Sequence, residues 1–63
     1  MDAESIYLSH IDQPYGQAFA AAVGRFQEGF LKDKAIDLDA AFAMAVDVTV
    51  QLLPAIKIKA GIA

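Results

Sequence analysis

The chain has 63 residues, of which 57% are apolar, with no cysteine, one histidine and a net charge of −3. These values exclude disulfides and thiolate metal sites and argue against a structural zinc site. They also argue against nucleic acid as a partner, because affinity for nucleic acid comes largely from Lys and Arg side chains that neutralise phosphates. A chain of this length buries only about 60% of its unfolded surface, so we expect one small domain, residues 1–63, that a partner stabilises.

The first predicted element is a short strand over residues 4–9. Ile6 and Leu8 fall on one face of an extended chain, and mostly polar side chains fall on the other, which is typical of a strand. His10 and Asp12 follow, and a histidine beside an acid could act as a general base with its orienting carboxylate. We interpret them instead as a polar residue at the end of the strand and the N-cap of the next element.

A long amphipathic helix is predicted over residues 13–31. Its large apolar residues recur at spacings of three and four: Tyr15, Phe19, Val23, Phe26 and Phe30. Beside this stripe, Gly16, Ala20 and Gly24 are spaced four apart. Small residues at this spacing let another backbone approach closely, which predicts a contact between this helix and a neighbouring helix.

The segment after residue 37 allows two interpretations. Residues 38–45 are strong helix formers, and the alternating valines from Val46 onward are β-branched, so we expect a short helix over 38–45 and a strand over 46–53. The alternative is one helix over 38–53, ended by Pro54, which would form a helical hairpin with the first helix.

A last strand is predicted over residues 55–62, where apolar and polar side chains alternate again. Lys57 and Lys59 are typical of a sheet edge protected from unwanted pairing. The predicted fold class is therefore small α+β, with two helices and strands near 4–9, 46–53 and 55–62. The alternative fold is mainly α.

The sequence contains no motif for catalysis, cofactor binding or metal binding, so we expect the protein not to be an enzyme. The alternating apolar side chains from Val46 onward must be buried against other residues, and large exposed apolar patches mark interaction sites. The predicted function is a structural or interaction subunit that self-associates or docks into a virion, a filament or a multi-subunit complex. The predicted interaction residues are Gly16, Ala20, Gly24, Val48, Val50, Ile56, Lys57, Ile58 and Lys59.

A membrane-associated protein is the first alternative, with residues 38–56 as an apolar helix. Asp47 lies near the middle of this segment and would cost about 2.5–3.5 kcal/mol at the centre of a membrane span. No secretory signal is visible at the N-terminus, which predicts a location in the cytoplasm or inside an assembled particle.

A small DNA-binding regulator or antitoxin is the second alternative. The predicted order of strand, helix and helix superficially resembles the ribbon-helix-helix repressors, in which outward side chains of the strand read DNA bases. The corresponding side chains here are Ser5, Tyr7 and Ser9, and the nearest charges are those of Asp2 and Glu4. Acidic neighbours oppose a DNA backbone, so we expect no nucleic acid partner.

Overall fold

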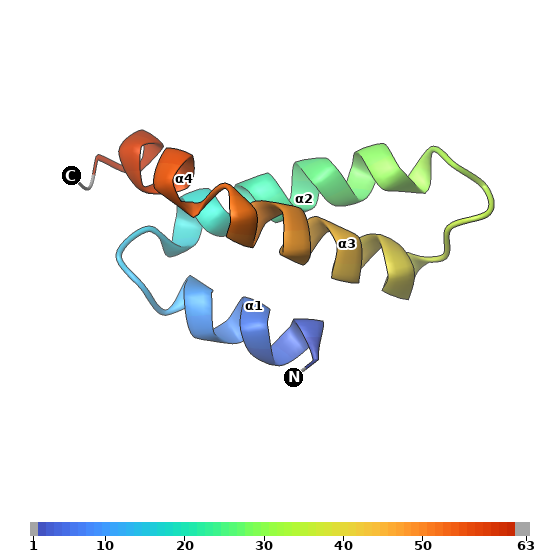
Figure 1. Cartoon of the computed structure of the whole chain (residues 1–63), viewed down its shortest axis with the longest axis horizontal. Helices are drawn as coiled ribbons and strands as arrows, with labels where there is room; N and C mark the ends of the chain where they lie inside the picture. Colours follow the sequence, from blue (N-terminus) through green and yellow to red (C-terminus); the bar gives the residue numbers. More distant parts are fainter. Residues whose placement is uncertain (1, 62–63) are drawn as a thin grey trace.

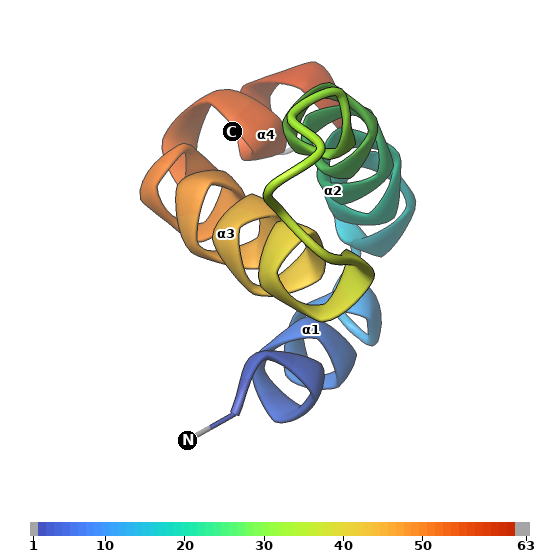
Figure 2. The same cartoon turned by 90° about the vertical axis from the view of Figure 1, so that its right-hand side faces the viewer.

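The computed structural model describes residues 2–61, and these form four helices (Figure 1). They are α1 (Ala3–Ile11), α2 (Gly16–Leu31), α3 (Leu38–Gln51) and α4 (Leu53–Lys59). Helices α2 and α3 form an antiparallel hairpin, and α1 and α4 lie on opposite sides of it (Figure 2). No strand occurs between residues 2 and 61, so the α+β prediction is wrong. The alternative, a mainly α chain with a helical hairpin, has the correct class.

Helix α1 replaces the strand predicted over residues 4–9. The Asp2 carboxylate accepts a hydrogen bond from the Ser5 backbone N–H at 2.8 Å and so caps the first turn. Tyr7, placed on the polar face of the expected strand, is half-buried, whereas Leu8 is 50% exposed. The half-buried residues of α1 have helical spacing: Ala3, Ile6, Tyr7, His10 and Ile11.

The cap at Asp2 should make the start of α1 sensitive to acid. The hydrogen bonds from the backbone and then the side chain of Ser5 hold the pKa of Asp2 below its ordinary value of 3.8. Because the folded pKa is the lower one, the cap stabilises the fold above the ordinary pKa and is lost as pH falls through the folded pKa. We expect the first turn of α1 to fray over this acidic range, as measured by Cα chemical shifts of its first residues.

Asp2→Asn is the matched control for this titration, because asparagine caps a helix about as well as aspartate but does not ionise. The first turn of this variant should keep its helical shifts through the same acidic range. Equal acid-induced fraying in the variant and in the natural chain would exclude Asp2 as the cause.

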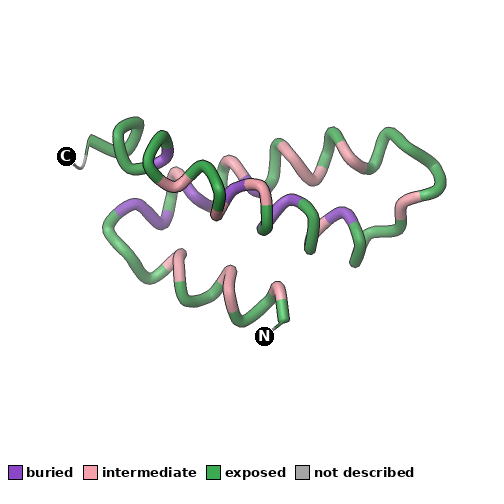
Figure 3. Tube along the Cα trace, in the orientation of Figure 1, coloured by how far each residue is buried: buried purple, intermediate pink, exposed green. Residues whose placement is uncertain are grey.

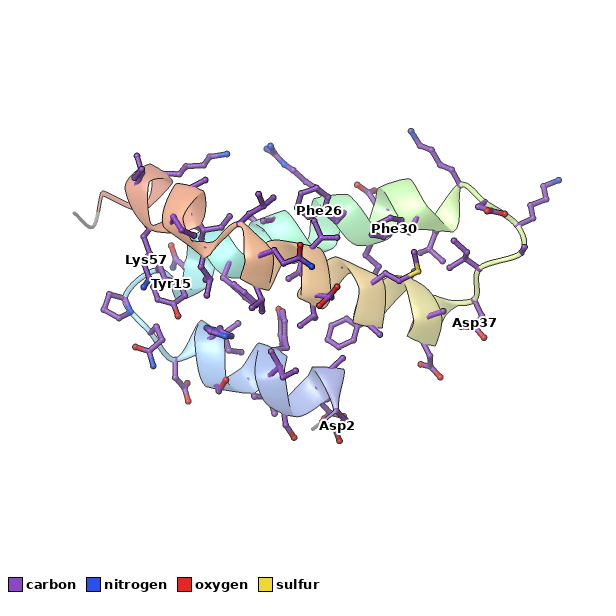
Figure 4. The ribbon with its side chains drawn as sticks, in the orientation of Figure 1. Asp2, Tyr15, Phe26, Phe30, Asp37 and Lys57 are labelled. Atoms are coloured by element: carbon purple, nitrogen blue, oxygen red, sulfur yellow. The ribbon has the colours of Figure 1, made fainter. Side chains whose placement is uncertain are left out.

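Helix α2 corresponds to the long helix predicted over residues 13–31, but it begins at Gly16. Phe19 and Val23 are buried, as the three–four spacing indicates. Phe26 and Phe30, on the same stripe, are half-buried rather than buried. Phe30 lies near the loop that joins α2 to α3, at the far end of the hairpin from α4 (Figure 4). Phe26 lies nearer to α4 and lines the groove between the two helices.

Helix α3 runs through the predicted boundary at residue 45, so neither the short helix over 38–45 nor the strand over 46–53 is correct. The Asp37 carboxylate caps it by accepting from the Ala40 N–H at 2.8 Å. Thr49 is fully buried, and its hydroxyl donates to the Ala45 carbonyl at 2.7 Å, which satisfies it within the helix. Packing against α2 thus outweighs the weak strand preference of the β-branched residues.

Helix α4 replaces the strand predicted over residues 55–62, of which residue 62 lies outside the described residues. Pro54 stands in its first turn, where no backbone hydrogen bond is lost. Two residues along a helix correspond to a rotation of about 200°. The alternating isoleucines therefore point to different sides: Ile56 is buried, and Ile58 is 76% exposed.

The core is small and centres on the α2–α3 hairpin, with α1 and α4 packed against it from opposite sides (Figure 3). Phe19 is its largest fully buried side chain, with Tyr7, His10 and Tyr15 as aromatic neighbours. The buried cluster consists of Tyr15, Phe19, Val23, Ala45, Val46 and Ile56. Several large apolar side chains remain at the surface because the core cannot enclose them.

Candidate docking surface

A groove of about 530 Å³ runs between α2 and α4. Four alanines line it, and their small side chains leave space between the two helices. Phe26, Leu52 and Ile56 supply larger apolar surface to the same groove. The alanines are Ala18, Ala21 and Ala22 on α2 and Ala55 on α4. This arrangement suits an apolar group better than a polar one.

Two cationic side chains, Arg25 on α2 and Lys59 on α4, also line the groove. None of the described residues that line it is acidic. From Val48 to Gly61 the sequence likewise contains no acid. The groove therefore combines an apolar lining with positive charge from both helices, in a chain whose net charge is negative.

Lys57 points to a different side of α4 from Lys59. Its Nζ lies 5.5 Å from the centre of the Tyr15 ring (Figure 4), a distance at which the ring attracts the ammonium group. This contact joins α4 to the turn between α1 and α2. The two lysines that the sequence suggested as one sheet edge thus have separate surroundings.

Exposed apolar side chains continue the surface of the groove along α4. Leu52 is 42% exposed and lines the groove, and Ile58 is 76% exposed. Ile58 follows Lys57 and precedes Lys59, so the most exposed of these side chains lies between two cations. An apolar tip with Lys59 at the groove on one side and Lys57 over Tyr15 on the other suits an interface that is apolar at its centre and anionic at its edge.

The small residues of α2 do not share one environment. A side chain at Gly16 would overlap the Ile11 carbonyl oxygen, so this glycine brings α2 close to the end of α1 within the chain. Ala20 is half-buried, and Gly24 is exposed, with no atom within 4 Å of where its Cβ would lie. A partner that docks along this stripe would therefore contact Ala20 and Gly24 but not Gly16.

The remaining predicted interaction residues lie on α3 and α4. Val48 and Val50 are half-buried on α3, and Val50 lines a second hollow of about 270 Å³ beside α1. Ile56 and Lys59 line the groove instead, so the structure separates these residues into two sites. Arg25 and the three alanines that α2 contributes to the groove were not predicted, although alanines on one face beside an arginine were visible in the sequence.

His10 packs against the aromatic core. Its Nδ1 lies 2.7 Å from the Tyr15 hydroxyl, and its ring stacks on Phe19 with a centroid distance of 4.9 Å. The structure therefore pairs it with Tyr15 and not with Asp12. Within residues 2–61, no group of three or more His, Asp or Glu side chains could hold a metal ion.

No single helix within residues 2–61 is both long enough and apolar enough to cross a membrane. Helices α3 and α4 meet that requirement only as a pair, and the chain bends by 76° between them. Because of this bend, α4 packs across α2, and the apolar segment predicted over residues 38–56 does not form one straight helix.

Comparison of the chain with protein-family models, with curated proteins and with solved structures finds no match. The function is therefore inferred from the surface of the chain itself.

Proposed function

We propose that the protein associates with the surface of anionic membranes through α4. The observation that carries this proposal is the apolar tip of α4: Ile58 is 76% exposed and lies between Lys57 and Lys59. Helices that lie in a membrane interface place apolar side chains among the acyl chains and basic side chains among anionic headgroups. In this arrangement Ile58 enters the interface and the lysines remain at its surface.

The distribution of charge supports this orientation. Asp37, in the loop between α2 and α3, and Lys57, on α4, lie at opposite ends of the molecule (Figure 4). Each Lys or Arg near an anionic surface contributes about 1 kcal/mol to binding. With α4 toward the membrane, the loop end of the hairpin, which carries three aspartates and two lysines over residues 32–39, is held away from the headgroups.

Binding at the surface agrees better with the fold than a membrane span does. Ala41, Ala45 and Val46 of α3 are buried in the fold, so a straightened α3–α4 span would have to remove them from their packing. Ile58 and Leu52 need no such rearrangement, because they are exposed in the folded chain. The proposal therefore keeps the four helices folded and uses only the surface of α4.

Ile58→Ser should weaken binding to vesicles that contain phosphatidylglycerol by about tenfold or more. Burial of an isoleucine side chain is worth about 1.5–3 kcal/mol, and about 1.4 kcal/mol corresponds to a factor of ten. Co-sedimentation with vesicles measures the loss. Binding of the natural chain should also fall with added salt, because salt screens the lysines.

Leu38→Ser is the matched control, since Leu38 is 62% exposed but lies at the start of α3, away from α4. This variant should bind vesicles like the natural chain, and both variants should keep their helical circular dichroism. Equal affinity of the natural chain for pure phosphatidylcholine vesicles, or equal losses in the two variants, would contradict the proposal.

A second candidate function is the assembly subunit that self-associates or docks into a larger complex. The small buried core and the exposed Leu52 and Ile58 favour it, because a second copy could cover the same residues. Sedimentation equilibrium without lipid separates the two candidates. An oligomer that Ile58→Ser dissociates would support assembly, whereas a monomer that binds vesicles would support membrane association.

A further inference from the structure

We infer that the groove between α2 and α4 holds one acyl chain of an anionic phospholipid, with the lipid phosphate at Arg25 and Lys59. This inference rests on the proposed membrane association and names the lipid class that the surface selects. Its basis is the coincidence of an apolar groove and two cations in a chain of net charge −3.

The groove has the size and lining that an acyl chain requires. Its volume of about 530 Å³ falls within the range of roughly 300–1,000 Å³ that is usual for small-molecule sites. Ala21 and Ala55 are exposed at its two walls, and Phe26 and Leu52 add apolar contact area. A methylene chain laid between these walls would cover apolar surface that now faces water.

The positive charges of the groove favour an anionic group at one end of the acyl chain. Arginine matches phosphate geometry with two parallel hydrogen bonds, and lysine supplies a compact charge. Arg25 and Lys59 come from different helices, and none of the described groove residues is acidic. An anionic headgroup can therefore meet both cations without a competing carboxylate in the groove.

The groove adjoins the surface of α4 that is proposed to meet the membrane. Consecutive residues of a helix are about 100° apart, so Ile58 lies next to the wall that carries Lys59. A lipid whose phosphate reaches Lys59 would have its headgroup beside the inserted Ile58. One orientation of the protein on the membrane therefore allows both the insertion of Ile58 and the contact between the lipid phosphate and Lys59.

Titration with a short-chain lysophosphatidylglycerol below its micelle concentration tests the inference, with amide NMR shifts as the readout. The shifts should change along residues 18–26 and 52–59. Lysophosphatidylcholine with the same acyl chain should bind at least tenfold more weakly. Equal affinity for the two lipids, or shifts confined to the hollow at Ala43 and Val50, would overturn the inference.

Charge variants identify the headgroup contact. The double variant Arg25→Gln, Lys59→Gln should bind lysophosphatidylglycerol at least tenfold more weakly. Lys32→Gln, Lys34→Gln changes the net charge equally but lies at the C-terminal end of α2 and the following loop, so it should bind like the natural chain. Equal losses in the two double variants would show a general charge effect and overturn the assigned contact.

Ala21→Leu should fill the groove and reduce lysophosphatidylglycerol binding at least tenfold. Ala21 is exposed, so the variant is expected to fold, and Ala40→Leu, at an exposed position of α3, is its control. Unchanged binding by Ala21→Leu would overturn the inference. Shifts of groove residues that depend on protein concentration alone would do the same, because they would identify a second copy as the occupant.

The result also separates this inference from the proposed function. If the protein binds anionic vesicles but the titration leaves the groove unchanged, the groove assignment fails and membrane association stands. If lysophosphatidylglycerol fills the groove but vesicles are not bound, membrane association fails. Ile58→Ser should lose vesicle binding and keep the titration, since Ile58 does not line the groove.

Discussion

Phe19→Ala is expected to destabilise the protein by about 3–5 kcal/mol, the usual cost of removing a fully buried phenylalanine. Phe19 is 0% exposed and lies at the centre of the aromatic cluster. Its ring centre is 6.0 Å from that of Tyr7 and 4.9 Å from that of His10, so it holds α1 against α2. At about 0.05–0.15 kcal/mol per residue, the whole chain has roughly 3–9 kcal/mol of stability, so this substitution would remove a large part of it.

Urea unfolding followed by circular dichroism measures this loss. Phe30→Ala is the matched control, because Phe30 is on the same stripe of α2 but is half-buried near the loop between α2 and α3 (Figure 4). We expect a clearly smaller loss for Phe30→Ala. If the two variants lost the same stability, the core would not be centred on Phe19.

Gly16→Ala is expected to destabilise the fold by about 1–3 kcal/mol, the usual cost of forcing an extra group into a packed site. The added Cβ would overlap the carbonyl oxygen of Ile11, and a backbone atom cannot swing aside as a flexible side chain can. Relief requires the end of α1 to move away from the start of α2. The expected result is lower stability and altered NMR shifts around Ile11.

Gly24→Ala is the control with the same substitution in the same helix. No atom lies within 4 Å of its added Cβ, and Gly24 is exposed. Alanine is a better helix former by about 1 kcal/mol, so this variant should be more stable than the natural chain. A loss of stability for Gly16→Ala together with a gain for Gly24→Ala would show that Gly16 is kept for the close approach of α1 and α2. A loss of stability in both variants would contradict this explanation.

The residues of the candidate docking surface could be predicted from the sequence only in part. Ile56, Ile58 and Lys59 were expected to meet a partner, and the structure places all three on α4 at or beside one groove. Arg25 was missed, because it is more than thirty residues from Lys59 in the chain. Only the packing of α4 across α2 brings the two cations to the same groove.

Local patterns in the sequence determined the long helix and a break near Pro54; the structure places that break at Leu52, with Pro54 in the first turn of α4. The three–four spacing of Phe19, Val23 and Phe26 repeats over enough turns to distinguish a helix from a strand. A proline limits the backbone wherever it stands, so residue 54 had to start, end or interrupt an element. Neither conclusion depends on what the segment packs against.

For residues 4–9 and 46–61, only the tertiary structure decided between strand and helix. Alternating apolar and polar side chains indicate a strand only when one face of the strand is buried and the other is exposed. Between residues 38 and 45 the second face is mostly alanine, which is neither strongly apolar nor polar, so the alternation is a weak signal there. A strand also needs a neighbour for its backbone hydrogen bonds, whereas a helix satisfies its own. With α2 available as a packing surface, α3 buries Ala41, Ala45 and Val46 on one side, and the alternating pattern leaves Ile58 of α4 exposed.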